Sequence, residues 1–315
     1  MPVVQPVPMQ LFTDILMNVT LPIVALVGLG FGAQKRLRLD VPSLNRLIVF
    51  VIMPAFLVHF LSAARQPISE LWPTIYFTAI QFAALMAMGW FAAKLFRLPA
   101  EFAPILAMAT VYANVGNYGI PLVKLAFPPS FILHQSVITS MMTILIVSVG
   151  AWMLAPQRAE TSALARLKVA FETPVVPAVV AGLALRAAEV RLPPIVATPL
   201  ELIGATFPPL ALFALGAQLA ETGRGVLKVG PMSLVLVLKL LLAPALTWAL
   251  AIAMGIADDL TELYVVAAAT PVGVLLALFC AEYDRQPHFV SGAVLISTLL
   301  SPIVVTGWIL VMRLM

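Results

Sequence analysis

Runs of about 20 apolar residues follow one another along the whole chain, and only short polar connections separate them. A helix of that length crosses the hydrocarbon core of a bilayer, whereas the strands of a membrane barrel would alternate over about ten residues. The pattern predicts an all-α, polytopic membrane protein whose single transmembrane domain covers residues 1–315. Ten spans, numbered 1 to 10, are expected at about 11–33, 42–64, 71–95, 102–127, 131–154, 172–190, 197–221, 230–255, 260–283 and 287–313.

Span 4 departs from this pattern at Asn114-Val115-Gly116-Asn117-Tyr118-Gly119-Ile120-Pro121. Glycine permits non-helical backbone, and Pro121 cannot donate a hydrogen bond to the carbonyl one turn back. Backbone groups freed in this way cannot face lipid, so they must face protein or a wet cavity. We therefore expect a broken helix that forms half of a binding site for a small polar solute. The alternative is a kinked helix whose asparagines only bind neighbouring helices.

An internal repeat gives span 4 a counterpart. Pro22 and Pro177 are 155 positions apart, as are Pro54 and Pro209. The same offset lays Asn114 over Ala269 and divides the spans into repeats of five, at about 11–154 and 172–313. Because five is odd, the second repeat must enter the membrane from the opposite side, and the repeats are predicted to be inverted. Broken segments at matching places in such repeats indicate a transport site, so spans 4 and 9 are the expected pair.

Two broken helices that cross near the middle of the bilayer leave four half-helix ends inside the protein. Their N-terminal ends suit an anion, and their C-terminal ends and free carbonyls suit a cation. The expected substrate-binding residues are Asn114, Asn117, Tyr118, Gly119, Pro121, Thr270, Pro271, Val272 and Gly273. Leu276 stands where a second proline would match Pro121, so the break in span 9 is expected to be shallower.

Ionisable residues inside spans are costly, and each is a functional hypothesis. Lys239 in span 8 is expected either to balance the charge of an anionic substrate or to hold the carbonyls of a broken helix. His59 in span 2 is expected to relay protons or to be a neutral histidine bonded between helices. Glu282, at the end of span 9, is a candidate for ion coupling or a solvated end residue.

Composition supports the membrane assignment: 62% of residues are hydrophobic and 10% are charged, and the mean hydropathy is +1.05, whereas soluble chains carry about 25% charge. The net charge of +4 lies in short loops and does not indicate nucleic-acid binding. The single cysteine, Cys280, excludes an internal disulfide and Cys-rich metal clusters. With no Walker loop and no paired intramembrane aspartates, we expect neither an enzyme nor a cofactor or metal site.

The positively charged residues predict the orientation. Twelve of the 18 Lys and Arg residues fall in connections on one side of the predicted membrane, and five fall on the other. The positive-inside rule then places both termini outside, in a multi-pass protein of an inner membrane.

Three segments resemble the auxin efflux carrier family, which lies within the wider bile acid/sodium symporter relatives. The segments are Leu44-Asn45-Arg46 with Met53 to Ser62, Asn114 to Leu122, and Pro271 to Tyr283. The resemblance implies inverted five-helix repeats in a homodimer, with a scaffold of spans 1, 2, 6 and 7 and a transport part of spans 3–5 and 8–10. It also implies an elevator-like motion and substrates such as malate, malonate or auxin.

The sequence therefore predicts a secondary active transporter that moves small organic anions, in contact with membrane lipid and with possible H⁺ or Na⁺ coupling. The first alternative is a Na⁺-coupled organic anion symporter of the bile acid type. The second, from another class, is a passive channel or a ligand sensor built on a transporter fold.

Overall fold

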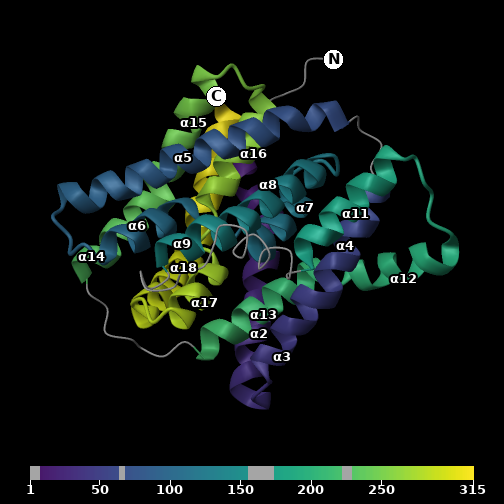
Figure 1. The fold of residues 1–315 in the computed structure, drawn as a ribbon, viewed down its shortest axis with the longest axis horizontal. Helices are drawn as coiled ribbons and strands as arrows, with labels where there is room; N and C mark the ends of the chain where they lie inside the picture. The colour runs from purple at the N-terminus through teal and green to yellow at the C-terminus, as the bar shows by residue number, and fades with distance from the viewer. Residues whose placement is uncertain (1–7, 64–67, 155–173, 222–228) are drawn as a thin grey trace.

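The computed structural model describes residues 8–63, 68–154, 174–221 and 229–315, and these residues form an all-helical protein (Figure 1). The α-helices of spans 1 to 5 are α1 (Pro8–Ile15), α2 (Leu21–Leu37), α3 (Val41–Leu47), α4 (Met53–Ala63), α5 (Trp72–Leu95), α6 (Phe102–Val111), α7 (Ile120–Ala126), α8 (Phe131–Leu145) and α9 (Ala151–Leu154). Those of spans 6 to 10 are α11 (Val175–Ala187), α12 (Pro194–Ala205), α13 (Phe207–Glu221), α14 (Val229–Val237), α15 (Ala243–Ala253), α16 (Asp258–Ala269), α17 (Val274–Glu282) and α18 (Pro287–Leu314).

Helical segments occupy the positions of all ten predicted spans. Six helices are long and apolar enough to cross a bilayer by themselves, namely Phe12–Leu37, Val41–Ala63, Ser69–Leu95, Pro194–Glu221, Gly230–Ala253 and Pro287–Leu314. Spans 4 and 9 are each divided into two shorter helices. The connection from α2 to α3 and the C-terminus lie at opposite ends of the molecule in Figure 1, as opposite membrane sides require.

Four prolines lie just after wide, π-helical turns. These turns are η1 (Leu16–Thr20) before Pro22, η2 (Ile48–Ile52) before Pro54, η4 (Val115–Gly119) before Pro121, and η6 (Leu238–Leu242) before Pro244. Proline removes one N–H and its ring clashes with the carbonyl one turn back, and a wider turn relieves that clash. Proline therefore widens spans 1, 2 and 8 without breaking them. A fifth such turn, η5 (Ile146–Gly150), lacks a proline at this spacing, whereas the 3₁₀ turn η3 (Ile68–Leu71) is followed by Pro73.

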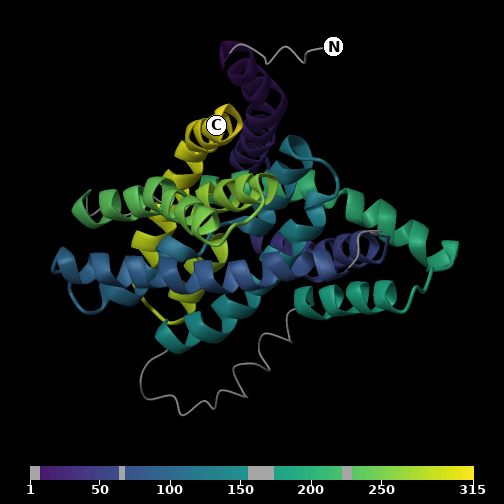
Figure 2. The ribbon, with the colours of Figure 1, turned by 90° about the horizontal axis from the view of Figure 1, so that it is seen from above.

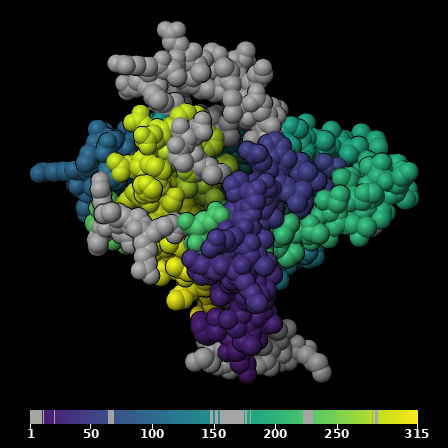
Figure 3. All heavy atoms as spheres, turned by 90° about the horizontal axis from the view of Figure 1, so that it is seen from below, coloured from purple at the N-terminus to yellow at the C-terminus, as the bar shows by residue number. Residues whose placement is uncertain are grey.

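Spans 1, 2, 6 and 7 pack chiefly against one another. α2 crosses α13, and α4 lies against α11 and α12. At the first crossing, a Cβ atom added to Gly30 would overlap with the backbone of Phe213, and one added to Gly216 would overlap with the backbone of Val27. The two glycines thus let the helix backbones touch, as small residues do in membrane helix pairs. Figures 2 and 3 show α11 and α12 projecting on one side of the molecule, away from the C-terminal helix.

The remaining spans form a second packed group. α5 lies along α6 and α8, and α16 lies against α15 and α18. The buried core runs through both groups and includes most residues around the interruptions in spans 4 and 9. The interruptions therefore lie in the interior of the protein, where freed backbone groups can be satisfied.

Candidate functional site

The interruptions of spans 4 and 9 meet and hydrogen-bond with each other. Ala113 and Val272 form an antiparallel bridge. The amide of Asn114 donates to the carbonyl of Pro271 at 2.8 Å, and the amide of Gly273 donates to the carbonyl of Tyr112 at 2.9 Å. Each unwound segment thus satisfies peptide groups of the other, as the membrane interior requires. The prediction that both spans are broken and that the breaks lie together is confirmed.

The expectation of a shallower break in span 9 is wrong. Residues 270–273 leave the helix completely, although Leu276 lies within α17. Pro271 explains the break, because a residue before proline avoids helical geometry, and Thr270 is extended at φ −62° and ψ 154°. Gly273 is also needed, since a Cβ there would collide with the ring of Tyr112. The missing second proline therefore does not prevent the interruption.

Helix α8 holds the first interruption in place. The side-chain amide of Gln135 donates to the carbonyl of Val115 at 2.8 Å, and the hydroxyl of Thr139 contacts the same carbonyl at 3.1 Å. Both side chains are buried. Sequence reasoning did not select Gln135 or Thr139, although polar residues recur along α8 at helical spacing. That spacing was the available signal, because a span facing only lipid would not carry it.

Ser297 and Lys239 hold the second interruption. The hydroxyl of Ser297 accepts a hydrogen bond from the amide of Val272 at 3.0 Å. The Nζ of Lys239 donates one to the carbonyl of Ala268 at 3.0 Å. Lys239 is fully buried and does not line the cavity between the interruptions. Of its two expected roles, the geometry favours holding the carbonyls of the broken helix. Sequence reasoning missed Ser297, which looks like an ordinary small residue of span 10.

A cavity of about 120 Å³ lies beside the two interruptions. This volume greatly exceeds the roughly 10–15 Å³ that one water needs. Four residues of its lining carry a carboxamide and three carry a hydroxyl, and the rest of the wall is apolar. The lining residues are Asn45, Ile48, Val49, Met53, Tyr112, Ala113, Asn114, Val115, Gly116, Asn117, Thr139, Thr143, Gln218, Gly273, Val274 and Leu275. No lining residue carries a charge, so a polar solute would meet only neutral donors and acceptors.

Asn114 is the most informative residue of this lining. Its side chain is 6% exposed, and its Nδ2 atom has no hydrogen-bond partner among the described residues. A buried donor without a partner costs about 1–3 kcal/mol, so it indicates a missing acceptor. The half-buried side chain of Asn117 lines the same cavity three residues along.

The other predicted site residues take different positions. Asn114, Asn117 and Gly273 line the cavity, whereas the remaining members of the predicted set do not, namely Tyr118, Gly119, Pro121, Thr270, Pro271 and Val272. His59 is half-buried on α4 and is not part of the lining. The side chain of Glu282 lies outside the described residues. The structure therefore brings the asparagines and the glycine together and separates them from the ionisable candidates.

A second cavity of about 470 Å³ adjoins the first, and Asn45, Gln218 and Val274 line both. The side-chain amide of Gln218 donates to the Oδ1 of Asn45 at 2.6 Å, so a hydrogen bond between spans 2 and 7 marks the boundary. Arg46 and Glu221 line the second cavity on the side away from the interruptions. This side corresponds to the connection after span 1, where Lys and Arg residues cluster.

Comparison with known families gives one match, to a family described as membrane transport protein. The family model matches twice, over residues 15–172 and 162–309, so that each match takes one half of the chain. A comparison with curated proteins finds no match. Paired matches to one model agree with the predicted repeat, and the members of this family are transporters rather than enzymes. The chain therefore belongs to the membrane transport protein family, which is the auxin efflux carrier family.

Proposed function

We propose that this protein is a secondary active transporter of small organic anions, in particular carboxylates. The observation that carries the proposal is the buried, unpartnered Nδ2 of Asn114, a residue that lines the cavity beside the two interrupted spans. An amide N–H without an acceptor suits a carboxylate oxygen, because hydrogen bonds to a charged acceptor are stronger than neutral ones.

The second interruption supports the same class of solute. Val274 and Leu275, in the first turn of α17, line the cavity. N–H groups in a first helical turn lack acceptors within the helix and carry partial positive charge. No carboxylate lines the cavity, so nothing there would repel an anion. A Na⁺ ion would have to bind amide, hydroxyl and carbonyl oxygens without any carboxylate, which makes anion transport the better-supported proposal.

The packing supports an elevator-type mechanism. The cavity is shared between residues of spans 2 and 7 and residues of spans 4, 5 and 9. Spans 1, 2, 6 and 7 would form the fixed scaffold, and the group that carries both interruptions would move past them. A homodimer would hold the scaffold still, and both termini would lie outside an inner membrane. Inverted repeats allow the two extreme positions to be nearly equivalent.

Replacing Asn114 tests the proposal. Asn114→Ala should abolish saturable uptake of a carboxylate into proteoliposomes, because the buried amide donor is lost, while the thermal unfolding midpoint stays close to that of the unaltered protein. Asn18→Ala, at an exposed asparagine of η1, is the matched control and should leave uptake unchanged. Uptake that survives Asn114→Ala would remove this residue from the site.

Two further measurements separate the alternatives. If Na⁺ is coupled, ligand-induced thermal stabilisation will increase with Na⁺ concentration, because an ion that binds with the substrate stabilises the same state. If the protein is a channel, substrate-specific counterflow will be absent. Binding without counterflow or flux would identify a sensor.

A further inference from the structure

A buried chain of hydrogen bonds joins three helices of the second packed group. The hydroxyl of Thr74 on α5 lies 2.6 Å from the Nδ1 of His134 on α8 and 2.8 Å from the hydroxyl of Tyr264 on α16. The three side chains are 0%, 9% and 1% exposed. The ring of Tyr264 also stacks on Phe77 at a centroid distance of 4.4 Å, which fixes its position. The proposed transport site uses none of the residues in this chain.

The chain lies between the two elements that hold the interruptions. His134 directly precedes Gln135, which binds the carbonyl of Val115. Tyr264 belongs to α16, the helix that ends at the second interruption and is held by Lys239. A change at Thr74 would therefore reach both halves of the cavity through short, rigid helices.

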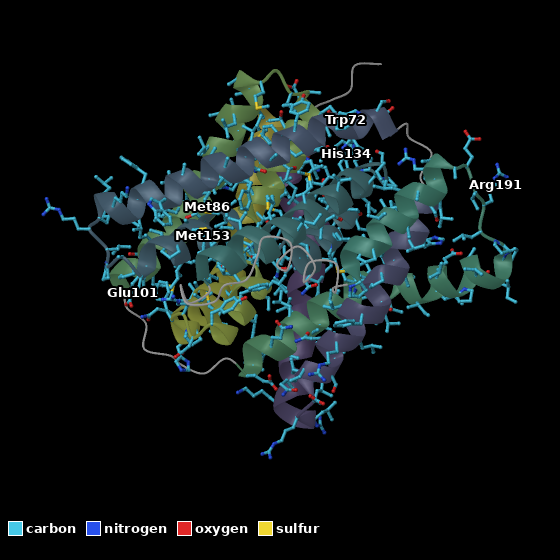
Figure 4. The ribbon with its side chains drawn as sticks, viewed as in Figure 1. Trp72, Met86, Glu101, His134, Met153 and Arg191 are labelled. Carbon is cyan, nitrogen blue, oxygen red and sulfur yellow. The ribbon has the colours of Figure 1, made fainter. Side chains whose placement is uncertain are left out.

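Two acidic residues interact with the His134 end of this hydrogen-bonded chain. Glu70, just before α5, and Asp259, in the first turn of α16, both interact electrostatically with the His134 ring. His134 lies in the first turns of α8, and Figure 4 shows it close to Trp72, at the start of α5, and far from Glu101. The ring is therefore near the end of the molecule that the charge distribution predicts to face outward.

Other elements that pack against α8 also carry titratable groups. Arg186 of α11 interacts with Glu70. Lys124 of α7 is exposed, and His59 of α4 is half-buried. Burial of the His134 ring opposes a positive charge on it, whereas the carboxylates of Glu70 and Asp259 favour one. These two carboxylates are thus the groups at this end of α8 that would stabilise a protonated ring.

We propose that His134, Thr74 and Tyr264 form a proton-binding site that is linked to the conformation of the two interruptions. In the neutral state, the Tyr264 hydroxyl donates to Thr74, and the Thr74 hydroxyl donates to Nδ1 of His134. When one proton binds the ring from the outer side, Nδ1–H donates to Thr74, and Thr74 turns its hydrogen toward Tyr264. One proton is gained, no bond between heavy atoms changes, and the hydrogen bonds reverse direction.

Proton binding and coupling are separate claims, and only the coupling rests on the proposed transport function. When the hydrogen bonds reverse, the Tyr264 hydroxyl no longer donates to Thr74 and instead accepts a hydrogen bond from it. This change alters how α16 is held against α5. Because α16 leads into the second interruption, the protonated and neutral states should differ in affinity for the anion. Reciprocal linkage then requires that anion binding change the proton affinity of His134.

Proton binding can be measured without any substrate. The protein has three histidines, so ¹⁵N-histidine NMR in lipid nanodiscs can follow each ring. The signal that disappears in His134→Gln is that of His134. We expect the His134 ring to change from neutral to doubly protonated between about pH 8 and pH 5. We expect Thr74→Val to move that midpoint, because it removes the shared hydroxyl.

The matched control is Thr78→Val, one turn along the same helix. Thr78 is equally buried, and its hydroxyl has no hydrogen-bond partner among the described residues. Thr78→Val should leave the titration midpoint of His134 unchanged. A His134 ring that stays neutral in a single tautomer over this pH range would overturn the proton site. A midpoint that moves equally in Thr74→Val and Thr78→Val would overturn the role of the chain.

Coupling is measured by the pH dependence of carboxylate affinity. In the unaltered protein, linkage to one proton allows the dissociation constant to change by up to about tenfold per pH unit. His134→Gln and Tyr264→Phe should flatten this dependence, whereas Thr78→Val should retain it. If His134 titrates but the affinity is independent of pH, the coupling is overturned and the proton site stands. If no carboxylate binds, the proposed function fails, and the NMR titration still decides the proton site.

Discussion

Gly273 shows how tightly a single residue constrains the meeting of the two interruptions. Its amide binds the carbonyl of Tyr112, while the ring of Tyr112 occupies the space where a Cβ would lie. Gly116, on the other side of the cavity, has more room, because the nearest atom to an added Cβ is a methyl group of Thr139 at 3.4 Å. The two glycines thus have different physical roles in one site.

We predict that Gly273→Ala destabilises the protein by about 1–3 kcal/mol through overpacking. Gly116→Ala, the matched control, should change stability little. Thermal unfolding in detergent measures both. Combining Gly273→Ala with Tyr112→Leu should restore part of the loss, because the smaller side chain makes room for the new methyl group. No rescue in the double variant would show that the loss has another cause.

Lys239 allows a second test at this scale, because its position separates two roles that the sequence left open. Lys239→Gln keeps a donor for the carbonyl of Ala268 but removes the charge. Since Lys239 does not line the cavity, we predict that carboxylate affinity in this variant stays within about twofold of the original, which is under about 0.4 kcal/mol. Isothermal titration measures the affinity. A loss of tenfold or more, with unchanged thermal stability, would instead assign Lys239 as the counter-charge.

At the scale of the helices, the crossing of α2 and α13 depends on the absence of two side chains. Gly30 and Gly216 each face the backbone of the opposite helix, and backbone cannot move aside as a flexible side chain can. Gly28 lies two residues before Gly30 on α2, and no atom lies within 4 Å of a Cβ added there. The same helix therefore offers one glycine that packing requires and one that it does not.

We predict that Gly30→Ala separates α2 from α13 and lowers stability by at least about 1–3 kcal/mol. Gly28→Ala should leave stability unchanged or raise it slightly, because alanine is the better helix former by up to about 1 kcal/mol. Thermal unfolding of the two variants side by side provides the comparison. Equal stability in both would show that the α2–α13 contact is not tight in the membrane.

The sequence was sufficient to predict the helices and their interruptions, because apolar length and the residues Asn, Gly and Pro act locally. It was not sufficient to find Gln135, Thr139 and Ser297, since a polar residue that binds freed backbone has the same local pattern as one that bonds two helices. The contribution of Asn45 and Gln218 to the cavity also depends on contacts between distant spans. Leu276 misled the prediction for span 9 because Pro271 itself ends the helix.

For the molecule as a whole, the two cavities differ in charge. The cavity at the interruptions is lined by no charged residue, whereas Arg46 and Glu221 line the adjoining one. Burying a carboxylate without a cation is costly, and burying two on one solute costs more. The wall is also mainly apolar, which suits a solute with a hydrocarbon body.

We therefore predict that monocarboxylates bind better than dicarboxylates of the same chain length at neutral pH. Butyrate and succinate form one such pair, and we expect a difference of at least about tenfold, or 1.4 kcal/mol. A thermal-shift titration with paired acids measures it. Tighter binding of the dicarboxylate would show that a cation reaches the site during binding, and Arg46 would be the first residue to test.

The bridge between Ala113 and Val272 has a consequence for biogenesis. While the ribosome is still making the second half of the chain, the carbonyl of Tyr112 and the amide of Asn114 have no partners, because Gly273 and Pro271 do not yet exist. Unpaired peptide groups are costly in lipid, so the newborn first half must be sheltered by the insertion machinery or by water. Substrate recognition thus emerges only when synthesis is nearly finished, and a truncated product cannot bind its solute.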